Sequence, residues 1–194
     1  MRIVELNENT RKNLLEDLLK RSPNQYTEYE ETVAKIIGEV RERGDEALFD
    51  YTLQFDKTKI NADNIRVTNE EIDAAYREVD AEFLRVLRAA IKNIESYHML
   101  QKRNSWFDTK EDGIILGQKI TPVASVGVYV PGGKAAYPSS VLMNVLPAKV
   151  AGVEQILMTT PPGKDGRVNP ATLVAAKEAG VTQIYKVGGA QAIA

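Results

Sequence analysis

Hydrophobic residues recur at helical spacing through the first 112 residues of the chain. The stripes follow the i, i+3, i+4 pattern of amphipathic helices. They consist of Leu14, Leu15, Leu18 and Leu19; Val33, Ile36, Ile37 and Val40; Ala47, Leu48 and Tyr51; Ile72, Ala75, Tyr76 and Val79; and Phe83, Leu87, Ala90, Ile91, Ile94 and Tyr97. The pattern predicts successive helices that form a packing layer.

Polar residues indicate where several of these helices begin. In a capping box, Ser or Thr and a Glu three residues later each satisfy a backbone amide of the other. The pairs that fit are Thr27 with Glu30 and Thr68 with Glu71, and the single candidate caps are Asp45 and Asp80. Gly44 suits the left-handed position that follows a helix.

The hydrophobic period changes near Gly113. Ile114, Ile115, Leu116 and Ile120 indicate a strand or hairpin that leads out of the helical part. Three short apolar runs follow, at 126–130, 155–160 and 181–187, and they alternate with two helix-like segments. The helix signals are Pro138 with Ser139 or Ser140 as cap, Asn169-Pro170 at the second start, and Gly180 at its end.

Strands that alternate with helices predict right-handed crossovers and a parallel sheet. The fold class is therefore α/β, with a helical N-terminal segment before a βαβαβ unit. Residues 190–194 give barely one turn of a further helix, which is too short to be stable alone. We therefore expect the unit to be truncated at its C-terminus.

Composition changes at the same place as the period. Residues 113–194 carry a net charge of +4, and residues 1–112 carry −6. Eleven of the 13 Gly and seven of the eight Pro fall in the later segment. This predicts a boundary between a mainly helical part, 1–112, and the start of a ligand-binding domain, 113–194.

Composition also excludes several classes of protein. The chain has no apolar run long enough for a transmembrane helix and no basic-then-apolar leader. A net charge of −2 argues against a nucleic-acid binder. Cys is absent, which excludes disulfides and thiolate zinc sites in this chain. We therefore expect a cytoplasmic protein without a membrane or nucleic-acid partner.

Two of the three predicted strands end in Gly-Gly, at 132–133 and 188–189. Parallel sheets bind ligands at the carboxyl ends of their strands, where glycine lets backbone amides approach a ligand closely. Such turns can equally be tight connections. Tyr129, next to last in its strand, either enters the core or lines the crevice. Gln191 is either exposed to solvent or placed where the ligand would lie.

No complete catalytic motif is present. Neither G-x-G-x-x-G nor a P-loop occurs. His98 is the single His, and its position on a long helix favours a structural role over catalysis. One His and no Cys make a zinc site within the chain improbable.

Several blocks together resemble the histidinol dehydrogenase family. They are Val126-Gly-Val-Tyr-Val-Pro-Gly-Gly133, Tyr137-Pro-Ser-Ser-Val-Leu-Met143, Pro147-Ala148, Ala151-Gly-Val153, Pro161-Pro162, Ala179-Gly-Val181 and Gly188-Gly-Ala-Gln-Ala-Ile-Ala194, preceded by Gly44-Asp45, Ala47-Leu48, Tyr51-Thr52 and Phe55-Asp56. Ile94, His98 and Gln101 also fit. The resemblance covers nearly the whole chain.

The resemblance implies incomplete Rossmann-like domains of the aldehyde-dehydrogenase-like superfamily. It implies a cytoplasmic homodimer that oxidises L-histidinol to L-histidine through L-histidinaldehyde, with NAD and one zinc per active site, as the last steps of histidine biosynthesis. Two NAD-contacting positions of the family fall on Tyr129 and Gln191. Gly132, Gly133, Gly188 and Gly189 would shape the same crevice.

The family's acid/base pair, its zinc ligands and a further NAD-contacting Asn belong to blocks beyond Ala194. None of the catalytic or metal residues is therefore expected in this chain, and we predict that it is inactive alone. Two other interpretations stay open. The chain could be an independent non-catalytic module that binds a nucleotide or partner, or a structural or regulatory fragment that binds nothing.

Overall fold

The computed structural model describes residues 7–8, 10–12, 27–132 and 136–194. The helices are α2 (Thr27–Arg43), α3 (Asp45–Asp56), α4 (Asn69–Glu78), α5 (Ala81–Met99), α6 (Pro138–Ala151) and α7 (Pro170–Ala179), with short 3₁₀ turns η1 (Glu111–Gly113) and η2 (Ala190–Ala192). The strands are β1 (Trp106–Thr109), β2 (Ile115–Gln118), β3 (Ser125–Tyr129), β4 (Gln155–Thr159) and β5 (Gln183–Tyr185). The leucine stripe at 14–19 and the side chain of Thr27 lie outside the described residues.

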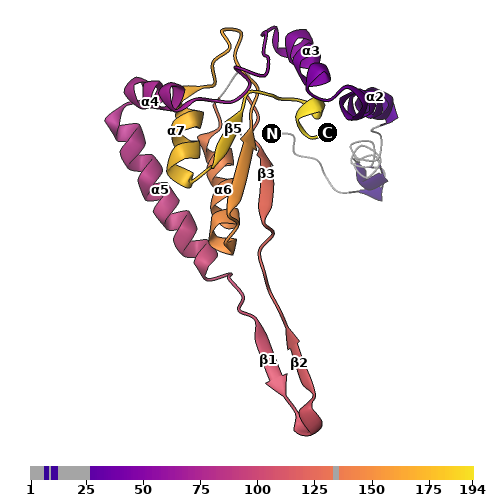
Figure 1. The fold of residues 1–194 in the computed structure, drawn as a ribbon, viewed down its shortest axis with the longest axis vertical. Coiled ribbons are helices and arrows are strands. Elements are labelled where there is room, and N and C mark those ends of the chain that lie inside the picture. The colour runs from indigo at the N-terminus through magenta and orange to yellow at the C-terminus, as the bar shows by residue number, and fades with distance from the viewer. Residues whose placement is uncertain (1–6, 9, 13–26, 133–135) are drawn as a thin grey trace.

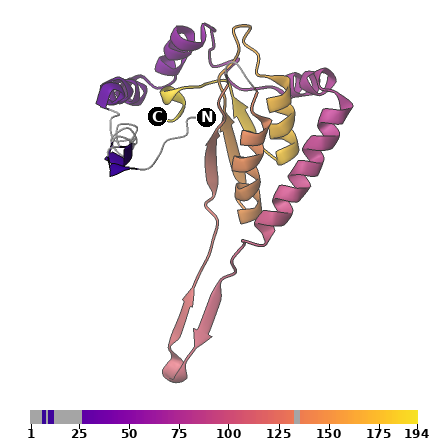
Figure 2. The same cartoon turned by 180° about the vertical axis from the view of Figure 1, so that it is seen from behind.

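The predicted βαβαβ unit is confirmed. β3, β4 and β5 form a parallel sheet in that order. Both crossover helices, α6 and α7, lie on one face of the sheet, behind the strands in Figure 1 and in front of them in Figure 2. β3 is as long as its predicted run but begins and ends one residue earlier, whereas β4 and β5 are shorter than theirs. Val130, Thr160 and residues 186–187 already belong to the loops at the carboxyl edge.

One apolar core joins this sheet to the helices. Alternate strand residues such as Val128, Met158 and Ile184 point into it and are at most 9% exposed. Helices α4 and α5 contribute Ala75, Leu87 and Ile91 to the same cluster, and α5 runs along the outside of α6 and α7 (Figure 1). Of the predicted helical layer, α4 and α5 therefore cover the crossover helices, whereas α2 and α3 pack against each other and η2.

The β5 edge of the sheet is covered by an extended segment that precedes α4. Val67 N donates to Ile184 O at 2.9 Å, and Lys186 N donates to Ile65 O at 2.8 Å. These antiparallel contacts satisfy backbone groups that an edge strand would otherwise expose. The segment also brings the start of α4 to the carboxyl end of β5.

Most of the predicted helix ends are confirmed, and the expectations for Gly44, for Asp45 and for Ser139 or Ser140 are wrong. The Thr68–Glu71 capping box, the Asp80 and Asn169 caps and the left-handed Gly180 are present. Position 45 is the first residue of α3, capped by Gly44, whose φ of 60° and ψ of −135° lie outside the left-handed helical region. Tyr137, without a side-chain bond, caps α6, and neither Ser139 nor Ser140 does so because Pro138 already occupies the first turn.

The predicted hairpin is also confirmed. β1 and β2 pair in antiparallel register and extend away from the body of the molecule as an arm (Figure 1). The composition boundary at 112–113 falls in η1, the turn at the tip of this arm, and the proposed division into domains stays a prediction. In the part of the chain that the structure describes, no helix combines the length and apolar character needed to span a membrane.

Candidate functional site at the carboxyl edge of the sheet

The turns that follow β3, β4 and β5 meet around the ring of Pro161. A Cβ added to Gly132 would lie 2.6 Å from Pro161 Cγ, and one added to Gly188 would lie 2.5 Å from Pro161 Cβ. Both glycines are therefore needed for a close approach to a neighbouring loop. The close approach to a ligand that the sequence suggested for them stays a prediction, and Gly133 lies outside the described residues.

Tyr129 ends β3 on the face of the sheet opposite to α6 and α7. Its neighbours Val128 and Val130 are buried at 9% and 0% exposure, whereas Tyr129 is half-buried. Its hydroxyl oxygen accepts a hydrogen bond from Gly189 N at 3.3 Å. Tyr129 therefore does not enter the core, and its contact with a ligand stays a prediction. Its hydroxyl connects the ends of β3 and β5.

Gln191 lies in η2, two residues after that contact. Its side chain is only 2% exposed, yet neither Oε1 nor Nε2 has a hydrogen-bond partner in the described part of the chain. Gly189 precedes it with φ 68° and ψ −168°, and an added Cβ there would lie 2.6 Å from Gln191 Oε1. An exposed Gln191 is therefore wrong, because α2 and α3 pack against η2 and cover it.

A buried amide without partners is costly, and native structures usually supply a partner for such groups. The amide can both donate to and accept from a ligand. Together with the hydroxyl of Tyr129, it forms a pair of hydrogen-bonding groups at the edge where parallel sheets hold ligands. These two residues fit a polar cofactor.

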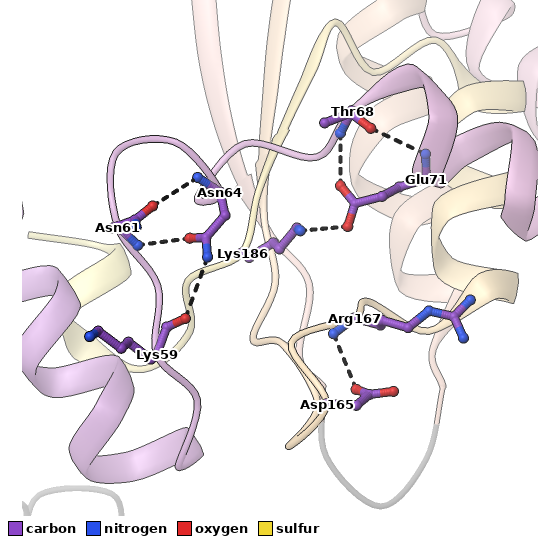
Figure 3. Close-up of polar contacts among 8 residues, drawn as sticks. All are labelled: Lys59, Asn61, Asn64, Thr68, Glu71, Asp165, Arg167 and Lys186. Carbon is purple, nitrogen blue, oxygen red and sulfur yellow. Dashed lines mark hydrogen bonds and ion pairs between the residues drawn. The ribbon is translucent and has the colours of Figure 1, made fainter.

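A cavity of about 340 Å³ lies at the same edge, and its lining includes neither Tyr129 nor Gln191. Its walls come from the ends of β3 and β4, the loop after Pro161 and the start of α7. In that loop, Asp165 Oδ1 accepts a hydrogen bond from Arg167 N at 3.1 Å (Figure 3). The Arg167 guanidinium is paired with Glu78, which raises the pKa of Arg167. This pairing turns the cation toward α4.

Three polar residues near this edge were missed by the sequence interpretation. Lys186 is 6% exposed and pairs with Glu71, the capping-box residue of α4 (Figure 3). Thr52 on α3 is fully buried and its hydroxyl has no partner in the described residues. Asp56, also on α3, has a buried Oδ2 without a partner there, and burial raises the pKa of Asp56. Thr52 and Asp56 stand in blocks that resemble the family, but only the folded chain shows that their polar atoms are buried.

His98 lies at the far end of the molecule from this edge. It belongs to the last turn of α5, and its Nδ1 lies 2.7 Å from Gln101 Oε1. It lines an open cavity of about 680 Å³ at the base of the arm, among exposed residues. Across the described ranges, no three side chains of His, Cys, Asp or Glu gather to hold a metal ion.

The fold and the site define an α/β protein with a polar crevice at the carboxyl edge of a parallel sheet. Residues 19–194 match the family model described as histidinol dehydrogenase. The chain belongs to the histidinol dehydrogenase family.

Individual relatives agree with this assignment. The chain is 59% identical to the histidinol dehydrogenase of Geobacillus kaustophilus over 86% of its length, and 52% identical to that of Halalkalibacterium halodurans over 100%. A crystal structure of the enzyme from Elizabethkingia anophelis is similar, with a TM-score of 0.79 and 37% identity over 85% of this chain.

The matches cover only part of the relatives. The chain spans 39% of the Geobacillus protein, 44% of the Halalkalibacterium protein and 38% of the Elizabethkingia chain. Family membership favours an enzyme-derived chain over an unrelated binding module.

Proposed function

We propose that these residues are the N-terminal part of an NAD-dependent histidinol dehydrogenase and contribute two side chains to its cofactor site. The parent enzyme oxidises L-histidinol to L-histidine through L-histidinaldehyde in the cytoplasm, as a homodimer. The observation that carries the proposal is the buried amide of Gln191, which lacks partners in the described residues and lies close in sequence to the Gly189–Tyr129 contact.

The two side chains have separate tasks in this proposal. NAD supplies the hydride acceptor when it is bound. Gln191 donates and accepts hydrogen bonds from a position that water reaches poorly, because its side chain is 2% exposed. Tyr129 holds the Gly189 amide, so that the turn after β5 keeps the position of Gln191. Both residues bind and orient, and neither transfers a proton.

Zinc does not fit the part of this chain that the structure describes. The described part holds no cluster of metal ligands, and His98 is separated from the crevice by the length of α5. We place the zinc ligands and the acid/base pair of the parent enzyme outside these 194 residues. An alcohol oxidation needs a base for the hydroxyl proton, so the isolated chain has no route to turnover.

The purified chain is expected to produce no NADH from L-histidinol and NAD, with or without added zinc. The absorbance of NADH measures this directly, with a full-length relative such as the Geobacillus enzyme as positive control. Zinc-dependent NADH formation above the rate without protein would contradict the proposed inactivity.

Replacing Tyr129 with alanine is expected to weaken NAD binding by about 10-fold or more, equivalent to at least about 1.4 kcal/mol. The thermal shift produced by millimolar NAD should shrink accordingly. Tyr97→Ala is the matched control, because Tyr97 is 61% exposed on α5. If NAD raised the Tm of wild type, Tyr129→Ala and Tyr97→Ala equally, the proposed role of Tyr129 in NAD binding would be wrong.

A further inference from the structure

The buried polar side-chain atoms without a hydrogen-bond partner are concentrated in one region. In the part of the chain that the structure describes, they are Thr52 Oγ1, Asp56 Oδ2 and the two polar atoms of Gln191. Thr52 and Asp56 are four residues apart on α3, and α3 packs against η2, which carries Gln191. All four atoms therefore belong to two elements in mutual contact.

A small apolar cluster packs these elements together. Ala190 of η2 packs against the cluster formed by Ile36, Ala47 and Tyr51, which joins α2 to α3. Thr52 follows Tyr51 directly and is 0% exposed. The three polar side chains do not satisfy one another in this arrangement, although native proteins pair nearly all such groups.

We propose that Thr52 and Asp56 join Gln191 in one recess that binds the hydroxyl groups of a ribose of the dinucleotide. The inference rests on the proposed function, because it extends the cofactor site from η2 to α3. A sugar diol can donate to the carboxylate of Asp56 and accept from the amide of Gln191. Thr52 can serve either hydroxyl.

The charge of the recess selects this part of the cofactor. Asp56 brings a carboxylate and neither Thr52 nor Gln191 brings a positive charge, so a phosphate group would be repelled. The burial that raises the pKa of Asp56 also strengthens a hydrogen bond to it. The recess is therefore suited to bind neutral hydroxyl groups that donate hydrogen bonds.

Two variants of the chain separate ligand binding from folding. Thr52→Val removes a hydroxyl without a partner and keeps the shape of the side chain. Without NAD, its Tm should stay equal or rise by about 2–4 °C, because an unsatisfied buried hydroxyl costs stability. Its NAD dissociation constant should rise about 10-fold for the lost hydrogen bond. Asp56→Asn should show the same pair of changes at neutral pH.

A second buried threonine provides the matched control. Thr58 is 5% exposed, and its hydroxyl donates to Gly163 O at 2.7 Å. Thr58→Val should therefore lower the Tm, with the NAD dissociation constant unchanged. Calorimetric titration with AMP and with nicotinamide mononucleotide identifies which ribose enters the recess, since each contains one.

The possible results are distinct. Weaker binding of NAD and of one mononucleotide by Thr52→Val and Asp56→Asn, with an undiminished Tm, supports the recess. Wild-type affinity in both variants overturns it and leaves the contacts of Tyr129 and Gln191 intact. A wild-type chain that binds no NAD at millimolar concentration overturns the recess and the proposed cofactor contacts together.

Discussion

Alanine at position 188 is expected to lower the free energy of unfolding by about 1–3 kcal/mol, because its methyl group has no space. The added Cβ would lie 2.5 Å from Pro161 Cβ and 3.0 Å from Pro161 Cγ. Gly188 is buried, so neither loop can move into solvent without exposing the end of β5. Urea denaturation of the purified variant measures the loss.

Gly132→Ala is expected to lower the free energy of unfolding by a similar amount, about 1–3 kcal/mol. It should differ from Gly188→Ala in its response to a second substitution, at Pro161. Its added Cβ would meet Pro161 Cγ at 2.6 Å and Cδ at 3.2 Å. Pro161→Ala removes both ring atoms and keeps Cβ. The second substitution should therefore rescue Gly132→Ala and leave most of the cost of Gly188→Ala.

The control for both variants is Gly127→Ala. Gly127 belongs to β3, and an added Cβ there meets no atom within 4 Å. Its substitution should change the free energy of unfolding by less than about 0.5 kcal/mol. If Pro161→Ala restored the stability of Gly132→Ala and Gly188→Ala equally, the described contacts of the two glycines with different atoms of Pro161 would be wrong.

The turns around Pro161 also show how far the sequence could predict this site. Local patterns predicted the strands and the helices that connect them. They also predicted the caps at Thr68, Asp80 and Asn169, because a cap depends on neighbours within a few residues. They placed Tyr129 and Gln191 at the correct edge. They failed to give the reason for Gly132 and Gly188, since Pro161 is a neighbour only in the folded chain.

The same reason explains why the sequence did not reveal the roles of Lys186, Thr52 and Asp56. Lys186 lies in an apolar run, and its partner Glu71 is 115 positions away in the chain. Thr52 and Asp56 look like the polar side of an amphipathic helix until η2 packs on α3. Burial and pairing depend on contacts between distant segments, which periodicity does not encode.

Glu71→Ala is expected to destabilise the chain by about 2–4 kcal/mol, because this carboxylate has two roles. Its Oε2 accepts from Thr68 N at 2.9 Å and completes the capping box of α4. Its Oε1 holds Lys186, whose side chain is 8% exposed (Figure 3). Removing the carboxylate leaves one cap incomplete and one buried ammonium unpaired.

Single and double variants divide these two contributions. Glu71→Gln keeps an oxygen for the Thr68 amide and should lose about half as much, roughly 1–2 kcal/mol. Thr68→Ala, which removes only the cap bond, should cost about 1 kcal/mol. The Glu71→Gln and Lys186→Met pair should cost less than the sum of its members, because no buried charge then remains.

Urea denaturation of the four proteins in the cycle measures the coupling. If the losses of unfolding free energy in Glu71→Gln and Lys186→Met simply added in the double variant, the two side chains would not interact as a buried pair. A coupled result has a consequence for the site, because Lys186 directly follows β5 and lies two residues before Gly188 in the segment that leads to Gln191. The start of α4 would then hold the turn after β5 in place, so Glu71→Ala should weaken NAD binding as well as folding. Thr68→Ala should weaken folding alone.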